Sequence, residues 1–162
     1  MDLRHTIERL SAAESIRDLV YRYSHLIDRG ELAEVAELFA DARYGQCDGD
    51  GVPVGVLIDR DPAAVLRANE SFIRMHGDPP SPRTKHLTTN VRVTVADNNI
   101  EASSLAYVTV LQGTGELPLQ PILTGRYFDR FALLDRQWRF TERLCCIDHV
   151  GNLSEHARRA LA

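Results

Sequence analysis

The sequence lacks the features that define several classes of protein. It has no tract of basic residues and its formal net charge is −4, so nucleic acid is not an expected partner. No apolar run reaches the roughly 18 to 20 residues that a membrane-spanning helix needs. The opening MDLRHTIERL has no apolar core of a secretory signal peptide. We therefore expect a cytoplasmic protein without nucleic-acid or membrane partners.

Cysteine is also scarce. Cys47, Cys145 and Cys146 make an odd count with an adjacent pair, which is neither a disulfide framework nor a zinc-binding spacing. No spacing of histidine with carboxylates matches a metal motif. We expect free cysteines in strands, no metal site and no other cofactor.

What is present indicates a globular chain. Apolar residues make up 44% of the 162 residues and charged residues 26%, a balance typical of a protein that buries a substantial core. No internal repeat, low-complexity tract or linker divides the sequence. We therefore predict one domain that spans residues 1–162.

The N-terminal part has the pattern of helices. Between residues 3 and 27, apolar residues recur at helical spacing and form one broad stripe. Ser11 and Glu14 match a capping box, which places the start of this helix near Ala12. Gly30 fits the left-handed position just past a helix end, and a second helix is expected over about 31–39.

The rest of the sequence predicts a hairpin, a third helix and four long strands. The hairpin covers residues 42–58, and Asp61 with Pro62 matches the cap and first turn of a helix. A short C-terminal helix is expected over residues 152–161, capped by Ser154. Alternation and turn residues predict strands at 86–97, 100–112, 119–134 and 137–150.

This order of elements predicts an α+β fold. Three helices in the N-terminal half would pack over one face of an antiparallel sheet. Long strands twist and coil, so the sheet should curve into a cone and leave a small-molecule pocket at its concave face. Because the outer face carries arginine, tyrosine and phenylalanine, we expect a homo-oligomer, a dimer or a trimer.

Three segments resemble a known family. They are IRDLVYRYSHLIDRGELAEVAELFADA at 16–42, KHLTTNVRV at 85–93 and GRYFDRFALLDRQWRFTER at 125–143. In this order they resemble the SnoaL-like branch of the nuclear transport factor 2-like superfamily. The resemblance, together with the element order, covers nearly the whole chain and implies the cone-shaped α+β fold described above.

The opening helix is similar to that of the scytalone dehydratase and bile acid dehydratase groups. Carried over residue by residue, the family's tyrosine, aspartate and histidine fall on Tyr23, Asp28 and His86. A further acid of the bile acid dehydratase group has no counterpart, because that strand reads SSLAYVTV here. We name as substrate-binding candidates Tyr44, Ser104, Tyr107 and Arg143. An arginine on the inner face could bind a substrate anion, and Arg143 is the candidate, whereas a solvated or interface role is favoured for the arginines of the last two strands.

The resemblance implies a cofactor-independent dehydratase or isomerase for a small hydrophobic hydroxy-carbonyl compound of polyketide, aromatic or steroid type. Such a reaction needs a base for the proton next to a carbonyl and a donor for the enolate oxygen. His86 would be the acid/base, Asp28 would orient it, and Tyr23 would be the donor.

Each of these residues has an alternative interpretation. Asp28 and Glu31 also match a capping box for the second helix. Tyr23 is also typical of a core tyrosine with its hydroxyl bonded to backbone. His86 shares strand parity with Asn90 rather than with the valines, so it faces away from the helices unless a bulge precedes Val91.

Two other functions fit the same fold. The first is a binding domain without catalysis, in which Asp28 and His86 would not meet. The second is an accessory subunit, like the beta subunits of ring-hydroxylating dioxygenases, which would associate with a larger iron-containing chain. This second alternative depends on analogy of fold.

Overall fold

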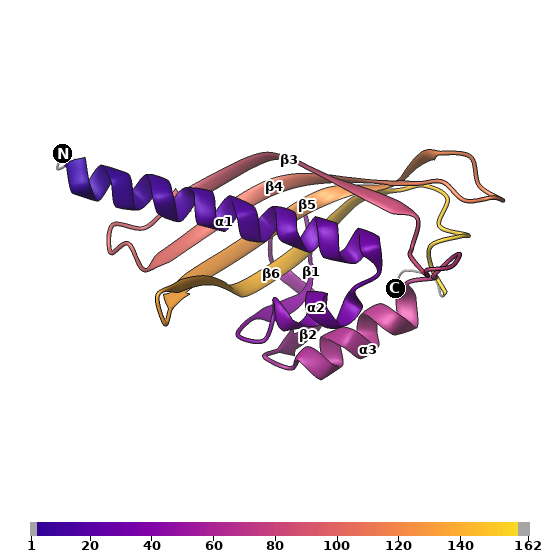
Figure 1. Ribbon diagram of the computed structural model, residues 1–162, viewed down its shortest axis with the longest axis horizontal. Helices are drawn as coiled ribbons and strands as arrows, with labels where there is room; N and C mark the ends of the chain where they lie inside the picture. The colour runs from indigo at the N-terminus through magenta and orange to yellow at the C-terminus, as the bar shows by residue number, and fades with distance from the viewer. Residues whose placement is uncertain (1–2, 159–162) are drawn as a thin grey trace.

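A computed structural model describes residues 3–158 (Figure 1). The long helix α1 is followed by a short helix and a hairpin, then by α3 and four long strands, in the predicted α+β order. The elements are α1 (Leu3–Arg29), α2 (Leu32–Glu37), β1 (Arg43–Cys47), β2 (Pro53–Asp59), α3 (Pro62–Phe72), β3 (Thr84–Val95), β4 (Glu101–Gln112), β5 (Gln120–Leu134) and β6 (Gln137–Val150).

The strands form one six-stranded sheet in the order β2-β1-β6-β5-β4-β3. The four long strands pair antiparallel with their neighbours in the chain, as predicted. The hairpin differs from the expected all-antiparallel sheet, because β1 pairs with β6 in parallel. No tight turn joins β1 to β6, since α3 and four strands separate them along the chain, so this pair could form in either direction.

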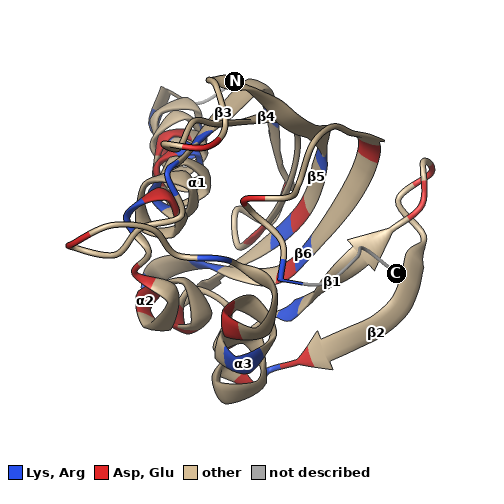
Figure 2. Cartoon of the chain, turned by 90° about the vertical axis from the view of Figure 1, so that its right-hand side faces the viewer, with Lys and Arg blue, Asp and Glu red and all other residues tan. Residues whose placement is uncertain are grey.

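The sheet curves around the helices (Figure 2). The helices lie on its inner face, where the main core forms between α1, α2 and the central strands. A smaller cluster of Cys47, Leu144 and Cys146, with Leu57 and Phe128, lies on the outer face under the β1–β2 hairpin. The inner-face side chains therefore point towards the helices and pack into this core.

Helix α1 begins at Leu3, nine residues before the predicted start at Ala12. Ser11 lies inside the helix, and its carbonyl accepts a hydrogen bond from the Ser15 hydroxyl. Arg9 joins this early part to the sheet by donating to the Val95 carbonyl at 2.6 Å. This contact between α1 and β3 stabilises the first turns of the helix, which the local capping signal at Ser11 did not predict.

The end of α1 follows the prediction. Gly30 has a φ of +78°, and its N–H donates to Ile27 while the Glu31 N–H donates to Leu26, both at 3.0 Å. No side chain caps α2, and the Glu31 carboxylate binds Arg29 instead. The alternative capping role of Asp28 is therefore wrong, because Asp28 lies in the last turn of α1 and bonds elsewhere.

Helix α3 begins as predicted, since the Asp61 carboxylate accepts a hydrogen bond from the Ala64 N–H at 2.9 Å and Pro62 lies in the first turn. The expected C-terminal helix is wrong for its described part, residues 152–158, which forms turns and one bridge, Ile73 to Ala157. Its backbone pairs with residues after α3, and residues 159–161 of that expectation lie outside the described part of the chain. None of the helices within residues 3–158 is long and apolar enough to cross a membrane.

Candidate functional site

A bulge in β3 turns His86 towards the helices. The pairing of β3 with β4 shifts between Thr89 and Arg92, and Asn90 has a φ of +53°. Side chains before the bulge therefore face inward at even positions, and those after it face inward at odd positions. His86 and the valine at position 93 thus share the inner face, which is the arrangement that an inward His86 requires.

Asp28 and His86 form a hydrogen-bonded pair. His86 Nδ1 lies 2.6 Å from Asp28 Oδ1, and the His86 backbone N–H donates to Asp28 Oδ2 at 2.9 Å. The Thr84 hydroxyl donates to Oδ1 at 2.7 Å. Burial opposes ionisation of this carboxyl, yet the hydrogen bonds and charge of His86 outweigh it and lower the pKa of Asp28. Asp28 is thus a carboxylate that fixes both the ring and the backbone of His86.

Tyr23 lies beside this pair on the same helix as Asp28. Its ring meets the His86 ring edge to face, with 6.2 Å between centroids, and it packs in the same way on Tyr127 at 5.8 Å. The hydroxyls of Tyr44 and Tyr127 are hydrogen-bonding neighbours of the Tyr23 hydroxyl. Burial raises the pKa of Tyr23 to about 12, so this phenol stays protonated at neutral pH.

Arg143 carries a buried positive charge beneath the tyrosines. Its guanidinium makes two hydrogen bonds of 2.7 Å to Asp129, and its side chain is 0% exposed. The carbon of the guanidinium lies 4.5 Å from the centre of the Tyr23 ring and 4.3 Å from that of Tyr127. One nitrogen, Nη1, has no hydrogen-bond partner within the described residues. Arg143 is therefore neither solvated nor at an interface of this chain, and Asp129 already binds two of its nitrogens.

The structure separates the four substrate-binding candidates. Tyr44 and Arg143 lie with Tyr23, whereas Ser104 donates to Asp129 at 3.3 Å and supports the ion pair from the side. Tyr107 is 51% exposed and has the opposite strand parity to Ser104, so it points away from the site on the outer face. We therefore place Tyr107 outside the site.

The sequence did not predict several residues of the site, namely Thr84, Tyr127 and Asp129. The positions of Tyr127 and Asp129 follow from how β5 pairs with β6. Tyr127 and Asp129 alternate on β5, and Asp129 lies directly opposite Arg143 on β6. Only the register of two strands brings these residues together, and the sequence does not show that register.

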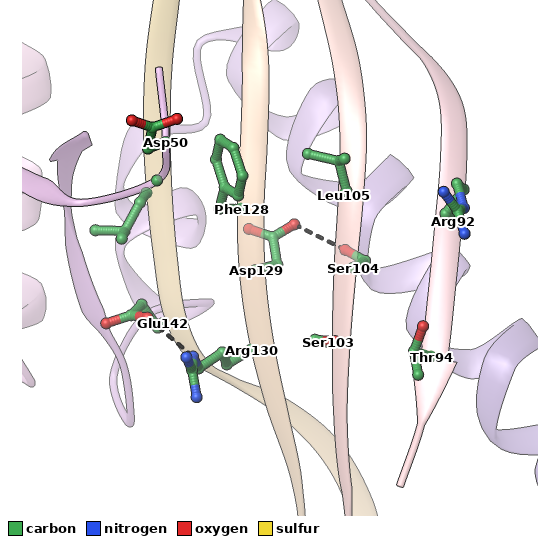
Figure 3. A pocket seen from close by; sticks show the side chains of 12 residues that line it. Asp50, Arg92, Thr94, Ser103, Ser104, Leu105, Phe128, Asp129, Arg130 and Glu142 are labelled. Carbon is green, nitrogen blue, oxygen red and sulfur yellow. Dashed lines mark hydrogen bonds and ion pairs between the residues drawn. The ribbon is translucent and has the colours of Figure 1, made fainter. Parts of the chain in front are cut away.

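The outer face has a hollow of its own, shown in Figure 3. Arg92 and Thr94 of β3 border it, and Arg130 on β5 forms an ion pair there with Glu142 on β6. Tyr23 and His86 lie on the other side of the sheet, with side chains 4% and 8% exposed. Homo-oligomerisation through this outer face stays a prediction.

The cysteines are free, in agreement with the expectation for strand residues. Cys47 and Cys146 lie opposite each other on β1 and β6, and burial raises the pKa of both thiols. Across residues 3–158, no three His, Cys, Asp or Glu side chains gather closely enough to hold a metal ion.

His156, in the segment after β6, is a buried histidine near the pair. Its ring packs on Phe72 and it is 8% exposed. Burial first, and then the charges of His86 and His76, lower the pKa of His156 to about 4, while Asp28 acts in the opposite sense. His156 is therefore uncharged at neutral pH.

This lowered pKa predicts a loss of stability on acidification. Below pH 6.5 the unfolded chain binds a proton at His156 that the folded chain accepts only near pH 4, so the free energy of unfolding falls as pH drops through this window. The shift corresponds to roughly 3 kcal/mol. Urea unfolding between pH 7 and 4 measures the slope, and His156→Phe is expected to flatten it. An equal slope in both proteins would contradict the assignment.

Comparison with known proteins places these features in a family. The model of the SnoaL-like domain matches residues 8–144. A candidate scytalone dehydratase of Novosphingobium aromaticivorans is 22% identical, with a TM-score of 0.69 and coverage of 90% of both chains. The beta subunit of a candidate aromatic-ring-hydroxylating dioxygenase of the same organism is 20% identical, with a TM-score of 0.70 and coverage of 88% of this chain and 93% of that chain.

LinA is a third structural neighbour, 19% identical, with a TM-score of 0.67 and coverage of 93% of this chain and 95% of that chain. No curated protein matches the sequence. At these identities the structural neighbours establish the fold alone. Since the family model covers most of the chain, the protein belongs to the SnoaL-like domain family.

Proposed function

We propose that the protein is a cofactor-independent dehydratase or isomerase that acts on a small hydrophobic hydroxy-carbonyl compound. The observation that carries this proposal is the 2.6 Å contact between Asp28 Oδ1 and His86 Nδ1, next to a buried tyrosine. A binding domain has no need of a carboxylate that orients a histidine ring, so this contact argues against binding alone. The accessory-subunit alternative depends on fold alone.

The base of the proposed reaction is His86 Nε2. Asp28 is a carboxylate that accepts a hydrogen bond from Nδ1–H, which leaves the lone pair on Nε2. When Nε2 takes the proton next to the substrate carbonyl, the ring becomes an imidazolium, which Asp28 stabilises. Because the Thr84 hydroxyl and the His86 N–H also bind Asp28, the carboxylate cannot swing away during this step.

Tyr23 is the donor to the enolate oxygen. Its raised pKa, about 12, keeps the proton on the phenol, so it donates without giving the proton up. The Arg143 cation lies 4.5 Å from the Tyr23 ring centre and favours negative charge that develops on this side of the site. The tyrosine and the arginine thus stabilise the charge that His86 creates.

The proposed dehydration balances without another reactant. The C–H bond breaks towards His86, and its electron pair forms the enolate. The enolate then collapses, the C–O bond of the β-hydroxyl breaks, and the leaving oxygen takes the proton from His86 to form water. In an isomerisation the same proton returns to a different carbon. The candidate scytalone dehydratase among the structural neighbours supports the first of these reactions.

The test uses 3-hydroxy-1-tetralone, a bicyclic β-hydroxy ketone whose dehydration gives fluorescent 1-naphthol. We expect the wild-type protein to release naphthol faster than buffer does. A parallel NMR experiment in heavy water follows exchange of the protons next to the carbonyl, which detects the proton-transfer half of the reaction. Failure of both measurements across a panel of bicyclic hydroxy ketones would remove the proposal.

Tyr23→Phe is expected to lower kcat by about 10²- to 10³-fold, the usual effect of removing one oxyanion donor. The phenyl ring keeps the packing on Phe39 and Tyr127, so the fold should survive. Naphthol fluorescence measures the change. Tyr21→Phe is the matched control, because Tyr21 lies on the same helix and is 41% exposed. Equal kcat values for both variants would contradict the role of Tyr23.

A further inference from the structure

The segment after β6 contacts Gln112, which pairs with Thr84 beside Asp28. In Figure 1 this end of the chain lies beside the end of α3. The Arg74 N–H donates to the His156 carbonyl and the Arg158 N–H donates to the Phe72 carbonyl, both at 2.8 Å. The Glu155 carbonyl lies 2.6 Å from His76 Nε2 and accepts a 3.1 Å hydrogen bond from Gln112. These contacts fix the position of His156.

Two buried polar atoms at this end lack partners within the described residues. They are Nδ1 of His156 and Oε1 of Gln112, on side chains that are 8% and 0% exposed. The amide nitrogen of Gln112 binds the Pro82 and Glu155 carbonyls, so Oε1 points the other way. A buried polar atom without a partner costs stability, which makes both atoms candidates for contact with a ligand or an ordered water.

Both residues adjoin the Asp28–His86 pair. Gln112 lies opposite Thr84 in the β3–β4 pairing, and the Thr84 hydroxyl binds Asp28. Gln112 also touches the residue before His156 through the Glu155 carbonyl. The two unpartnered atoms therefore lie at the same end of the sheet as the base.

We propose that His156 and Gln112 recognise an uncharged hydroxyl group on the ligand, remote from the carbonyl that Tyr23 binds. The location of the site rests on the proposed function. A hydroxyl suits both atoms, because it donates its one proton to Gln112 Oε1 and accepts a hydrogen bond from His156 Nδ1–H in the tautomer that carries the proton there. A cationic or anionic group does not suit them, since neither side chain offers an opposite charge at neutral pH. The ligand class of the proposed function is thus narrowed to hydroxy-carbonyl compounds with a second, distal hydroxyl.

The experiment compares two aromatic probes in binding, which requires no turnover. They are 1-naphthol and 1,6-dihydroxynaphthalene, whose second hydroxyl lies on the far ring, and calorimetry gives the Kd of each. We expect the wild-type protein to bind the diol about tenfold more tightly. His156→Phe should abolish this preference while leaving the Kd of 1-naphthol unchanged. His156→Asn, whose amide lies near the place of Nδ1, should restore part of it.

Two controls separate the outcomes. His76→Phe removes a tether of the segment and keeps the His156 ring, so any effect should fall equally on both probes. His86→Ala should keep the preference for the diol, because binding requires no base. If the wild-type protein prefers the diol but does not turn over the tetralone, the proposed function alone is overturned. Turnover of the tetralone without a preference would overturn the role of His156 alone and indicate a buried water at Nδ1. The role of His156 would also be overturned if His156→Phe kept the preference for the diol, or if the wild-type protein bound neither probe.

Discussion

His86→Ala is expected to lower kcat for naphthol release by on the order of 10²- to 10⁴-fold, the contribution of a positioned acid/base group. Asp28→Asn should lower kcat by a comparable factor, because an amide that donates to Nδ1 would leave the proton on Nε2 and remove the base. Steady-state fluorescence measures both. The double variant should lose little more than either single one, since the two side chains act as one unit.

The matched control for these variants is His25→Ala. His25 lies on the same helix as Asp28 and is exposed, so its loss should leave kcat unchanged. Unfolding curves must show that the variants remain folded, because Asp28 also binds Thr84 and the β3 backbone. Full turnover by His86→Ala would exclude His86 as the base, whatever the distance between the two side chains.

Arg143→Met is expected to destabilise the fold by about 3 to 5 kcal/mol, because it leaves the Asp129 carboxylate buried without a partner. Asp129→Asn should cost a similar amount by leaving the guanidinium unpaired. The double variant, which buries neither charge, should cost much less than the sum of the two. Urea unfolding at pH 7 measures all three.

Arg130→Met is the control for this set. Arg130 lies on the strand that carries Asp129, but its charge is at the outer face and its side chain is 74% exposed in the pair with Glu142. Its loss should cost at most about 1 kcal/mol. If Arg143→Met and Asp129→Asn were additive in the double variant, the pair would not be the source of the destabilisation.

The sequence determined the local structure well. Hydrophobic periodicity is a local signal, and it predicted the C-terminal end of α1 and the four long strands near their observed bounds, although α1 starts nine residues before the predicted Ala12. Gly30 and Asp61 acted as predicted, because a left-handed helix end and a helix cap involve only neighbouring residues. The family resemblance of the first segment also selected Tyr23 and Asp28, which share one helix five residues apart.

The tertiary structure decided how distant segments meet. The bulge at Asn90 turned His86 inward, and the register of β5 with β6 placed Asp129 opposite Arg143. The segment after β6 is irregular instead of helical, because its backbone pairs with residues 72–74. Strand parity alone turned His86 the wrong way, since one inserted residue reverses every side chain beyond it.

The sequence by itself therefore determined most of the elements, and its family resemblance selected the fold and the three side chains of the proposed reaction. Only the tertiary structure decided that Asp28 and His86 lie 2.6 Å apart, that Tyr107 faces outward and that the His156 side chain is buried. The physical reason is the range of the interactions. Helix periodicity and capping act over a few residues, whereas buried polar contacts join residues far apart in the chain, 58 positions for Asp28 and His86 and 43 for Gln112 and Glu155.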